Sequence, residues 1–235
     1  MKFAEWLYLT EKKFEKEDHL TPTQKAARQR KKNTGVHNLA KNISSLEKKI
    51  SADLSSDDEG TRLTAAAVKT MLDTSERVGN TASAKDGHHG VTGLCKKHMK
   101  RHNGKVQLHY TGKSGMKQEK ELKDKRVIKA LNPGGGGSLF TTKDGREVKN
   151  TTINGYLKEF GITSKDIRGY NANKFMAQRL AGIKLSDEKE RKKKFLEILD
   201  EIAEKVGHTP SMLRNSYLTP GMEDNFLKHG KIKKP

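Results

Sequence analysis

A histidine and a tyrosine lie near the end of the chain in the sequence K-V-G-H-T-P-S-M-L-R-N-S-Y-L-T-P, which begins at residue 205. The imidazole of His208 can donate a hydrogen bond to an oxygen, and the phenol of Tyr217 can act as a nucleophile. Taken alone, a histidine at a helix end and a tyrosine in a helix usually have structural roles. Chemistry at these residues therefore requires partners from elsewhere in the chain.

The local sequence predicts that His208 lies at a corner between two helices. Gly207 suits the position just after a helix C-terminus, and Thr209-Pro210 suits the N-cap and first residue of a new helix. Tyr217 would then lie about two turns into the second helix. The first helix has an apolar face made of Phe195, Leu196, Ile198, Leu199, Ile202, Ala203 and Val206.

The G-H-T-P and S-Y elements are similar to a signature that type IB DNA topoisomerases share with tyrosine recombinases, and three more motifs carry the same resemblance. M-L-D-T-S-E-R-V-G-N resembles a helix end that delivers a catalytic arginine, here Arg77, with Gly79 ending the helix. A predicted hairpin over residues 105 to 123 carries Lys113 at its tip. I-T-S-K-D-I-R resembles the segment of a second arginine, Arg168, and has Lys165 where recombinases typically have histidine.

The resemblance implies a complete catalytic set in the family's order: Arg77, Lys113, Arg168, His208 and Tyr217. Attack by the tyrosine would give a 3′-phosphotyrosine and free a 5′-hydroxyl, so that supercoiled DNA is relaxed without a nucleotide cofactor or a metal. The arginines and the histidine would clamp the charge of the transition state, and the lysine would protonate the leaving oxygen. Lys165 and Asn173 are expected to contact DNA.

Composition favours a polyanionic partner. The 235 residues include 48 Lys and Arg against 29 Asp and Glu, and the formal net charge is +19. Such an excess exceeds what solubility requires and fits a broad phosphate-binding face. The resemblance implies that the partner is double-stranded DNA. No apolar run predicts a membrane span, and the single cysteine, Cys95, fits a reducing, intracellular and DNA-associated setting. The resemblance implies a monomer without a small-molecule cofactor.

The expected fold class is mainly α (α+β): a helical catalytic domain with a small three-stranded antiparallel sheet within residues 90 to 123. Residues 1 to 33 are interpreted as a basic N-terminal arm, 34 to 220 as the catalytic domain and 221 to 235 as a basic tail. The arm is too short for the family's N-terminal β-rich domain, so the chain is either a minimal enzyme or an excised domain. An early amphipathic helix is predicted from Val36, Leu39, Ile43, Leu46, Ile50 and Leu54.

Two other kinds of site have partial sequence support. Cys95 and His98, with further histidines nearby, have spacings that could hold zinc, although a lysine-rich stretch favours phosphate contacts. The sequence T-G-K-S suggests a phosphate-binding loop, but Gln107 occupies the position of its first glycine and a strand is predicted there. Metal and nucleotide binding are therefore not expected.

Two other functions are compatible with the same residues. A tyrosine recombinase would use the same tyrosine chemistry, but would need a core-binding arm domain and partner protomers. A basic DNA-binding protein without catalysis would need the positive charge alone. Relaxation of a plasmid without specific sites separates the topoisomerase from the recombinase, and trapping of a covalent adduct separates both enzymes from the binding protein.

Overall fold

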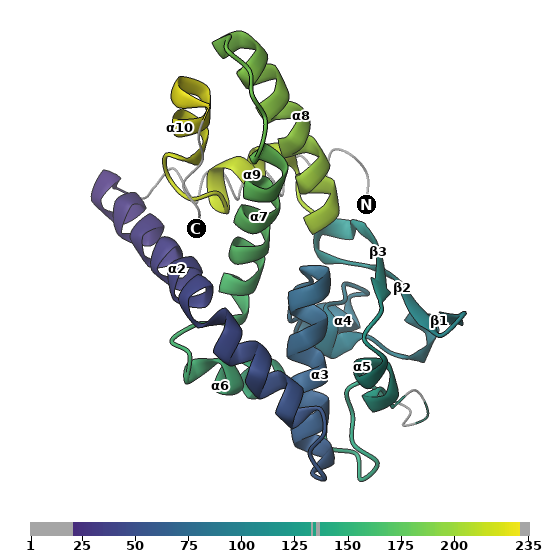
Figure 1. Ribbon diagram of the computed structural model, residues 1–235. Coiled ribbons are helices and arrows are strands. Elements are labelled where there is room, and N and C mark those ends of the chain that lie inside the picture. The colour runs from purple at the N-terminus through teal and green to yellow at the C-terminus, as the bar shows by residue number, and fades with distance from the viewer. Residues whose placement is uncertain (1–20, 133, 135–136, 231–235) are drawn as a thin grey trace.

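The structure, a computed structural model, describes residues 21–132, 134 and 137–230. It is mainly helical with one small sheet at one side (Figure 1), which confirms the predicted fold class. Within these residues, no helix has the length and apolar character that crossing a membrane requires. The elements are α2 (Pro22–Asp53), α3 (Glu59–Thr74), α4 (Thr81–Lys85), η1 (Val91–Gly93), η2 (Lys96–His98), β1 (Met99–His102), β2 (Lys105–Thr111), η3 (Lys113–Gly115), β3 (Lys117–Leu122), α5 (Lys125–Ala130), α6 (Asn150–Lys158), α7 (Ser164–Leu180), α8 (Glu188–Val206), α9 (Pro210–Ser216) and α10 (Met222–His229).

Helix α2 begins earlier than its apolar repeat predicts. The Thr21 hydroxyl accepts from the Gln24 amide and the Gln24 side chain accepts from the Thr21 amide, so a capping box starts the helix, with Pro22 in its first position. The helix continues past residue 33, so the predicted boundary between arm and catalytic domain falls inside α2. The rest of the predicted arm, residues 1 to 20, lies outside the described residues.

Two glycines allow α2 and α7 to cross closely. A Cβ atom on Gly35 would lie 2.2 Å from the carboxylate of Asp166, and one on Gly169 would lie 2.8 Å from Val36. Any larger side chain would therefore push the two helices apart. This crossing fixes the first turns of α7, which carry Arg168, against α2.

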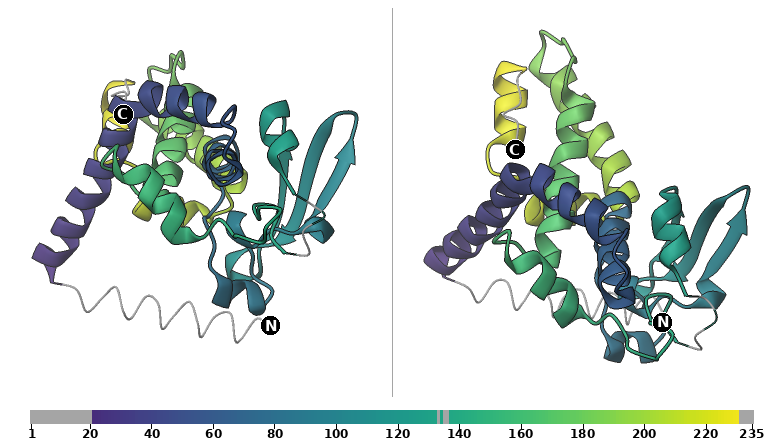
Figure 2. Two further views of the ribbon diagram at one scale, coloured as in Figure 1. Left: turned by 90° about the horizontal axis from the view of Figure 1, so that it is seen from below. Right: turned by 60° about the horizontal axis from the view of Figure 1, so that its bottom comes forward.

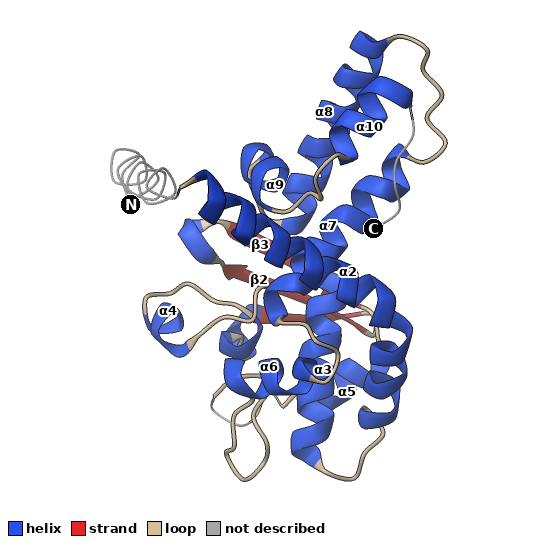
Figure 3. Cartoon of the chain, turned by 90° about the vertical axis from the view of Figure 1, so that its left-hand side faces the viewer, coloured by secondary structure: helices blue, strands red, loops and turns tan. Residues whose placement is uncertain are grey.

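The sheet has the strand order β1-β2-β3, and all pairs are antiparallel (Figure 3). In β2, the side chains of Val106, Leu108 and Tyr110 are buried at every second position, as expected for a strand with one face on the core. The predicted hairpin and its tip are confirmed. The sheet begins at Met99 rather than near residue 90, because residues 91–93 and 96–98 form short 3₁₀ turns.

The buried apolar side chains form two clusters joined by α7. The first cluster packs α2, α3, the sheet, α5 and α6 around the start of α7, where Ile167 and Tyr170 contribute. The second packs the remainder of α7 against α8, α9 and α10, and Met176 and Leu180 contribute to it. Figure 2 shows α7 running between these two groups of helices. Arg168 lies near the junction of the two clusters.

The C-terminal segment differs from the predicted basic tail. Residues 222–229 form α10, in which Met222 and Phe226 are buried in the second cluster. The prediction of an unpacked tail is therefore wrong for this stretch, because two apolar side chains one turn apart are enough to dock a short helix on α8. Residues 231 to 235 lie outside the described part of the chain. Leu196, predicted in the apolar face of α8, is instead 39% exposed.

Truncation of Phe226 tests the packing of α10. Phe226→Ala removes a fully buried ring that lies 6.2 Å from the ring of Phe195, and is expected to lower the free energy of unfolding by about 3–5 kcal/mol. Urea denaturation measures this loss. Lys228→Ala, an exposed change in the same helix, is the control and should leave stability unchanged. Equal stability of both variants would show that α10 does not belong to the core.

Candidate active site

Arg168 is a buried cation at the centre of the site. It is 3% exposed, and its guanidinium donates to the carbonyl oxygens of Ser75 at 2.7 Å and of Val206 at 2.5 Å. These carbonyls lie at the C-terminal ends of α3 and α8, where helix carbonyls lack partners and carry partial negative charge. One side chain of α7 therefore holds two helix ends together.

His208 follows the end of α8 as predicted. Gly207 caps α8 in the left-handed conformation with φ 68°, and the His208 amide donates to the carbonyl oxygen of Ala203 at 2.8 Å. The His208 Nε2 atom lies 2.8 Å from Nη2 of Arg168. Because a guanidinium can only donate, Nε2 acts as the acceptor in this arrangement.

Tyr217 lies directly after α9, and the prediction that it lies within the helix is corrected. Thr209 caps the start of α9 as predicted, but the helix ends at Ser216. The Tyr217 ring centroid lies 4.3 Å from that of His208, with the planes tilted by 39°. The nucleophile candidate and the histidine are therefore in contact in the folded chain.

Arg77 lies in an extended segment three residues after the end of α3. The helix ends at Thr74 because Ser75 adopts a left-handed conformation with φ 60°, so the predicted end at Gly79 is corrected. The carbonyl oxygen of Arg77 accepts from the amide of Val91 at 2.8 Å, which ties the segment to the following 3₁₀ turn.

The electrostatics of Arg168 connect these residues. Burial, followed by the nearby positive charge of Arg77, lowers the pKa of the Arg168 guanidinium. Tyr217 and then Glu76 oppose this shift. The structure therefore groups Arg77, Arg168, His208 and Tyr217, four of the five residues predicted to be catalytic.

Lys113, the fifth predicted residue, is exposed at the tip of the β2–β3 hairpin, in a 3₁₀ turn. The hairpin itself lies against the His208 corner, because a Cβ atom on Gly207 would come within 2.7 Å of the Gln118 side chain. This turn joins two antiparallel strands, whereas a phosphate-binding loop precedes a helix, which argues against the nucleotide-binding alternative.

Lys165 and Asn173, the predicted DNA contacts, lie in different surroundings. Lys165 is exposed in the first turn of α7. Asn173 is fully buried: its Nδ2 donates to the carbonyl oxygens of Gly169 and Tyr217, and its Oδ1 accepts from the Thr219 amide. The interpretation of Asn173 as a DNA contact is therefore corrected, because its side chain holds the backbone of the Tyr217 segment.

Cys95 and His98, the residues of the zinc alternative, contact each other. The Cys95 Sγ lies 3.5 Å from Nδ1 of His98, and that nitrogen accepts from the Cys95 amide. Burial lowers the pKa of His98 to about 4. Across the described ranges, no three His, Cys, Asp or Glu side chains gather in a way that could hold a metal ion.

Comparison with known proteins identifies the family. Residues 21–233 match the catalytic core of eukaryotic DNA topoisomerase I, and the chain belongs to this family. A DNA topoisomerase 1B of Acanthamoeba polyphaga mimivirus is 28% identical over 180 residues, which cover 67% of this chain and 52% of that protein. The chain thus spans about half the length of this curated relative.

Among solved structures, the chain matches two complexes of the XerH site-specific recombinase bound to difH substrate. The post-cleavage complex is 15% identical with a TM-score of 0.47, and the match covers 82% of this chain and 49% of that chain. The pre-cleavage complex is 14% identical with a TM-score of 0.46, covering 83% and 53% respectively.

Asn173→Ala tests the support of the Tyr217 segment. The change leaves the Thr219 amide and the Tyr217 carbonyl without their partner, and is expected to cost about 1–3 kcal/mol of stability. Amide exchange at Thr219 should accelerate. The control is Asn38→Ala, which removes a surface hydrogen bond to the Gly161 carbonyl. Unchanged exchange at Thr219 in the Asn173 variant would contradict the assigned role.

Proposed function

We propose that this chain is a type IB DNA topoisomerase that relaxes supercoiled duplex DNA through a transient covalent bond to Tyr217. The observation that carries this proposal is the contact between His208 and both Tyr217 and Arg168, beside the charge of Arg77. Membership of the topoisomerase I family supports it. The net charge of +19 agrees with a DNA substrate.

Cleavage begins at Tyr217. Its oxygen gives up the phenol proton to water and bonds to the phosphorus of the scissile phosphodiester, while the bond from phosphorus to the 5′ oxygen breaks. The products are a 3′-phosphotyrosine and a free 5′-hydroxyl. Because one phosphoester bond replaces another, the reverse reaction can reseal the strand without a nucleotide cofactor.

The cationic side chains stabilise the transition state. Arg77 and Arg168 offer charged donors to the non-bridging oxygens, and their guanidinium groups stay protonated at physiological pH. In the DNA-free protein, Nε2 of His208 accepts from Arg168. To donate to a phosphate oxygen, His208 must give up this contact and carry a proton on Nε2. DNA binding would therefore exchange an internal hydrogen bond for two contacts to the phosphate.

Lys113 supplies the proton for the leaving oxygen. An alkoxide is a poor leaving group, so a general acid at this oxygen speeds cleavage and acts as the general base in resealing. The exposed hairpin tip suits this role, because it can reach into a groove of bound DNA. Between cleavage and resealing, torsion in the DNA rotates the free 5′ end and removes supercoils. Lys165, exposed on α7, would contact the DNA backbone.

Replacement of Tyr217 tests the nucleophile. Tyr217→Phe is expected to abolish the covalent adduct with a suicide DNA substrate while duplex binding persists, because the ring remains and the attacking oxygen is lost. Denaturing electrophoresis detects the adduct. The matched control is Tyr156→Phe, which removes a hydroxyl in α6, a helix that carries none of the proposed catalytic residues. This variant should react normally. An adduct formed by the Tyr217→Phe variant would disprove this role for Tyr217.

Replacement of Arg168 tests the phosphate clamp. Arg168→Ala should slow single-turnover cleavage by about 10²–10³-fold, the typical cost of losing one donor to a developing oxyanion. Because Arg168 also joins α3 to α8, thermal unfolding of the variant must be measured beside the rate. His208→Ala offers a comparison in which these backbone contacts stay intact. A full cleavage rate in both variants would contradict the clamp.

Relaxation should need neither ATP nor metal. Plasmid relaxation by the parent protein is expected to proceed at full rate in excess EDTA without nucleotide, because positive side chains take the place of metal ions at the phosphate. Strong inhibition by EDTA would favour the zinc alternative at Cys95 and His98. Strand exchange between defined sites, in place of relaxation, would instead favour a recombinase.

A further inference from the structure

A buried carboxylate lies beside the cations of the site. Glu76 directly precedes Arg77 and is 2% exposed, a rare position for an acidic side chain without a charged partner. Its carboxylate contributes to the electrostatics of both Arg168 and Tyr110. Burial, and then the charge of Glu76, raises the pKa of the Tyr110 phenol. Glu76 has no role in the proposed cleavage steps.

The partner of Glu76 is Lys120, on strand β3 of the hairpin. Gln118, Lys120 and Leu122 occupy alternate positions of this strand, and the side chains of Gln118 and Leu122 are buried. Lys120 therefore points inward, and its Nζ lies 3.7 Å from Oε1 of Glu76. The two side chains are only 11% and 3% exposed, so water screens the pair weakly.

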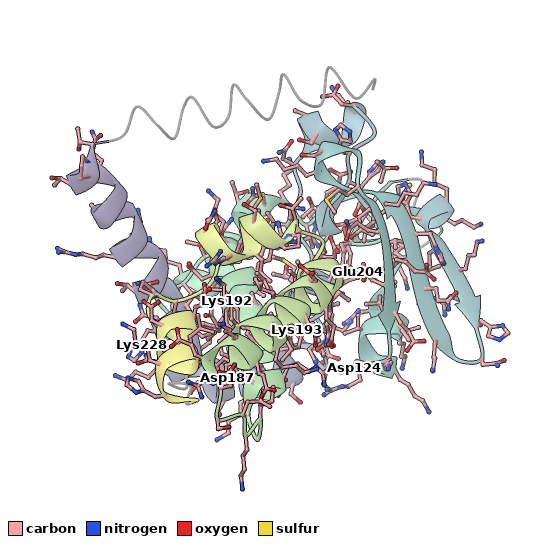
Figure 4. The ribbon with its side chains drawn as sticks, turned by 90° about the horizontal axis from the view of Figure 1, so that it is seen from above. Asp124, Asp187, Lys192, Lys193, Glu204 and Lys228 are labelled. Carbon is pink, nitrogen blue, oxygen red and sulfur yellow. The ribbon has the colours of Figure 1, made fainter. Side chains whose placement is uncertain are left out.

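The ammonium group of Lys120 also contacts α8. It donates to the carbonyl oxygen of Lys205 at 2.6 Å, three residues before His208. Figure 4 shows the last turns of α8, marked by Glu204, beside the hairpin. One ammonium group therefore joins the segment of Arg77, the hairpin with Lys113 at its tip and the helix end that leads to His208.

We propose that Glu76 and Lys120 are positioning residues that hold the hairpin so that Lys113 meets the leaving oxygen. This inference rests on the proposed function. The ion pair of Lys120 with Glu76 and the hydrogen bond of Lys120 to the Lys205 carbonyl oxygen tie three segments to one another, which favours one arrangement of the hairpin. An apolar side chain at residue 120 could fill the space but would not fix the hairpin against the carbonyl oxygen of Lys205.

The position of the hairpin controls proton transfer more than phosphate binding. Arg168 and His208 are held by α7 and by the α8–α9 corner, through hydrogen bonds that do not involve the hairpin. Lys113 is carried by the turn at the tip of the hairpin. Loss of the pair should therefore impair the general acid while the phosphate clamp remains.

Two DNA substrates distinguish these effects. Both are suicide duplexes, one with the ordinary 5′ oxygen at the scissile bond and one with sulfur in its place. A thiol is far more acidic than an alcohol, so the thiolate leaves without a proton from the protein. Lys120→Met should slow adduct formation with the oxygen substrate by about 100-fold, the scale of a misplaced catalytic group. With the sulfur substrate, the variant should react close to the parent rate.

The matched control is Lys105→Met. Lys105 forms an exposed pair with Glu121 across the same two strands, at 3.4 Å, and its loss should change neither rate. If Lys120→Met does not fold, Glu76→Leu with Lys120→Met replaces the pair by apolar side chains and should show the same selective loss.

Each remaining outcome overturns the inference. An unchanged rate with oxygen would show that the pair does not position Lys113. An equal loss with both substrates would show that the pair supports the whole site and not the general acid. If the parent chain forms no adduct with either substrate, the proposed function itself fails, and this inference fails with it.

Discussion

The site depends on the burial of one guanidinium. Removing a charged side chain from water costs several kcal/mol unless hydrogen bonds and opposite charge replace the lost hydration. For Arg168, the lost hydration is replaced by hydrogen bonds to carbonyl oxygens at the C-terminal ends of α3 and α8 and to the imidazole of His208. The helix ends gain donors that their own backbone cannot provide. The same contacts that bury the arginine therefore assemble the segments around it.

This assembly leaves an excess of positive charge that a phosphate can neutralise. Arg77 lies close enough to lower the pKa of Arg168, and Nε of Arg168 is buried without a hydrogen-bond partner among the residues described. The carboxylate of Glu76 offsets part of this positive charge, while the ammonium group of Lys120 adds to it. A DNA phosphodiester would bring negative charge to the point where it is lacking. The positive charge that the fold gathers at this site is therefore the same charge that would bind the substrate phosphate.

The fold divides the task of positioning between its two apolar clusters. The first cluster holds the segment of Arg77 and the hairpin, and the second holds the corner of His208 and the segment of Tyr217. Helix α7 belongs to both, and it supplies Arg168 near their junction together with Asn173, which fastens the backbone of Tyr217 and Thr219. A shift between the clusters would therefore separate Tyr217, the proposed nucleophile, from the residues proposed to bind the phosphate.

The sequence by itself determined the local structure and the family. Gly207, Thr209 and Pro210 mark a helix end and a helix start through backbone preferences that act within a few residues, and the alternating pattern of β2 likewise predicts a strand. The motifs around Arg77, Arg168 and Tyr217 resemble those of the topoisomerase family strongly enough to predict the membership that the comparison shows.

Only the tertiary structure decided how distant segments meet. Asn173 is 44 residues from Tyr217 in the chain, so no local pattern could show that its amide is buried against that backbone. No local pattern shows that Glu76 and Lys120 form a buried pair, because burial of a pair depends on both partners. Helix α10 docks through two apolar side chains, and the stability that they contribute depends on the surface against which they are buried. Backbone preferences are local, whereas burial and charge pairing are properties of the assembled fold.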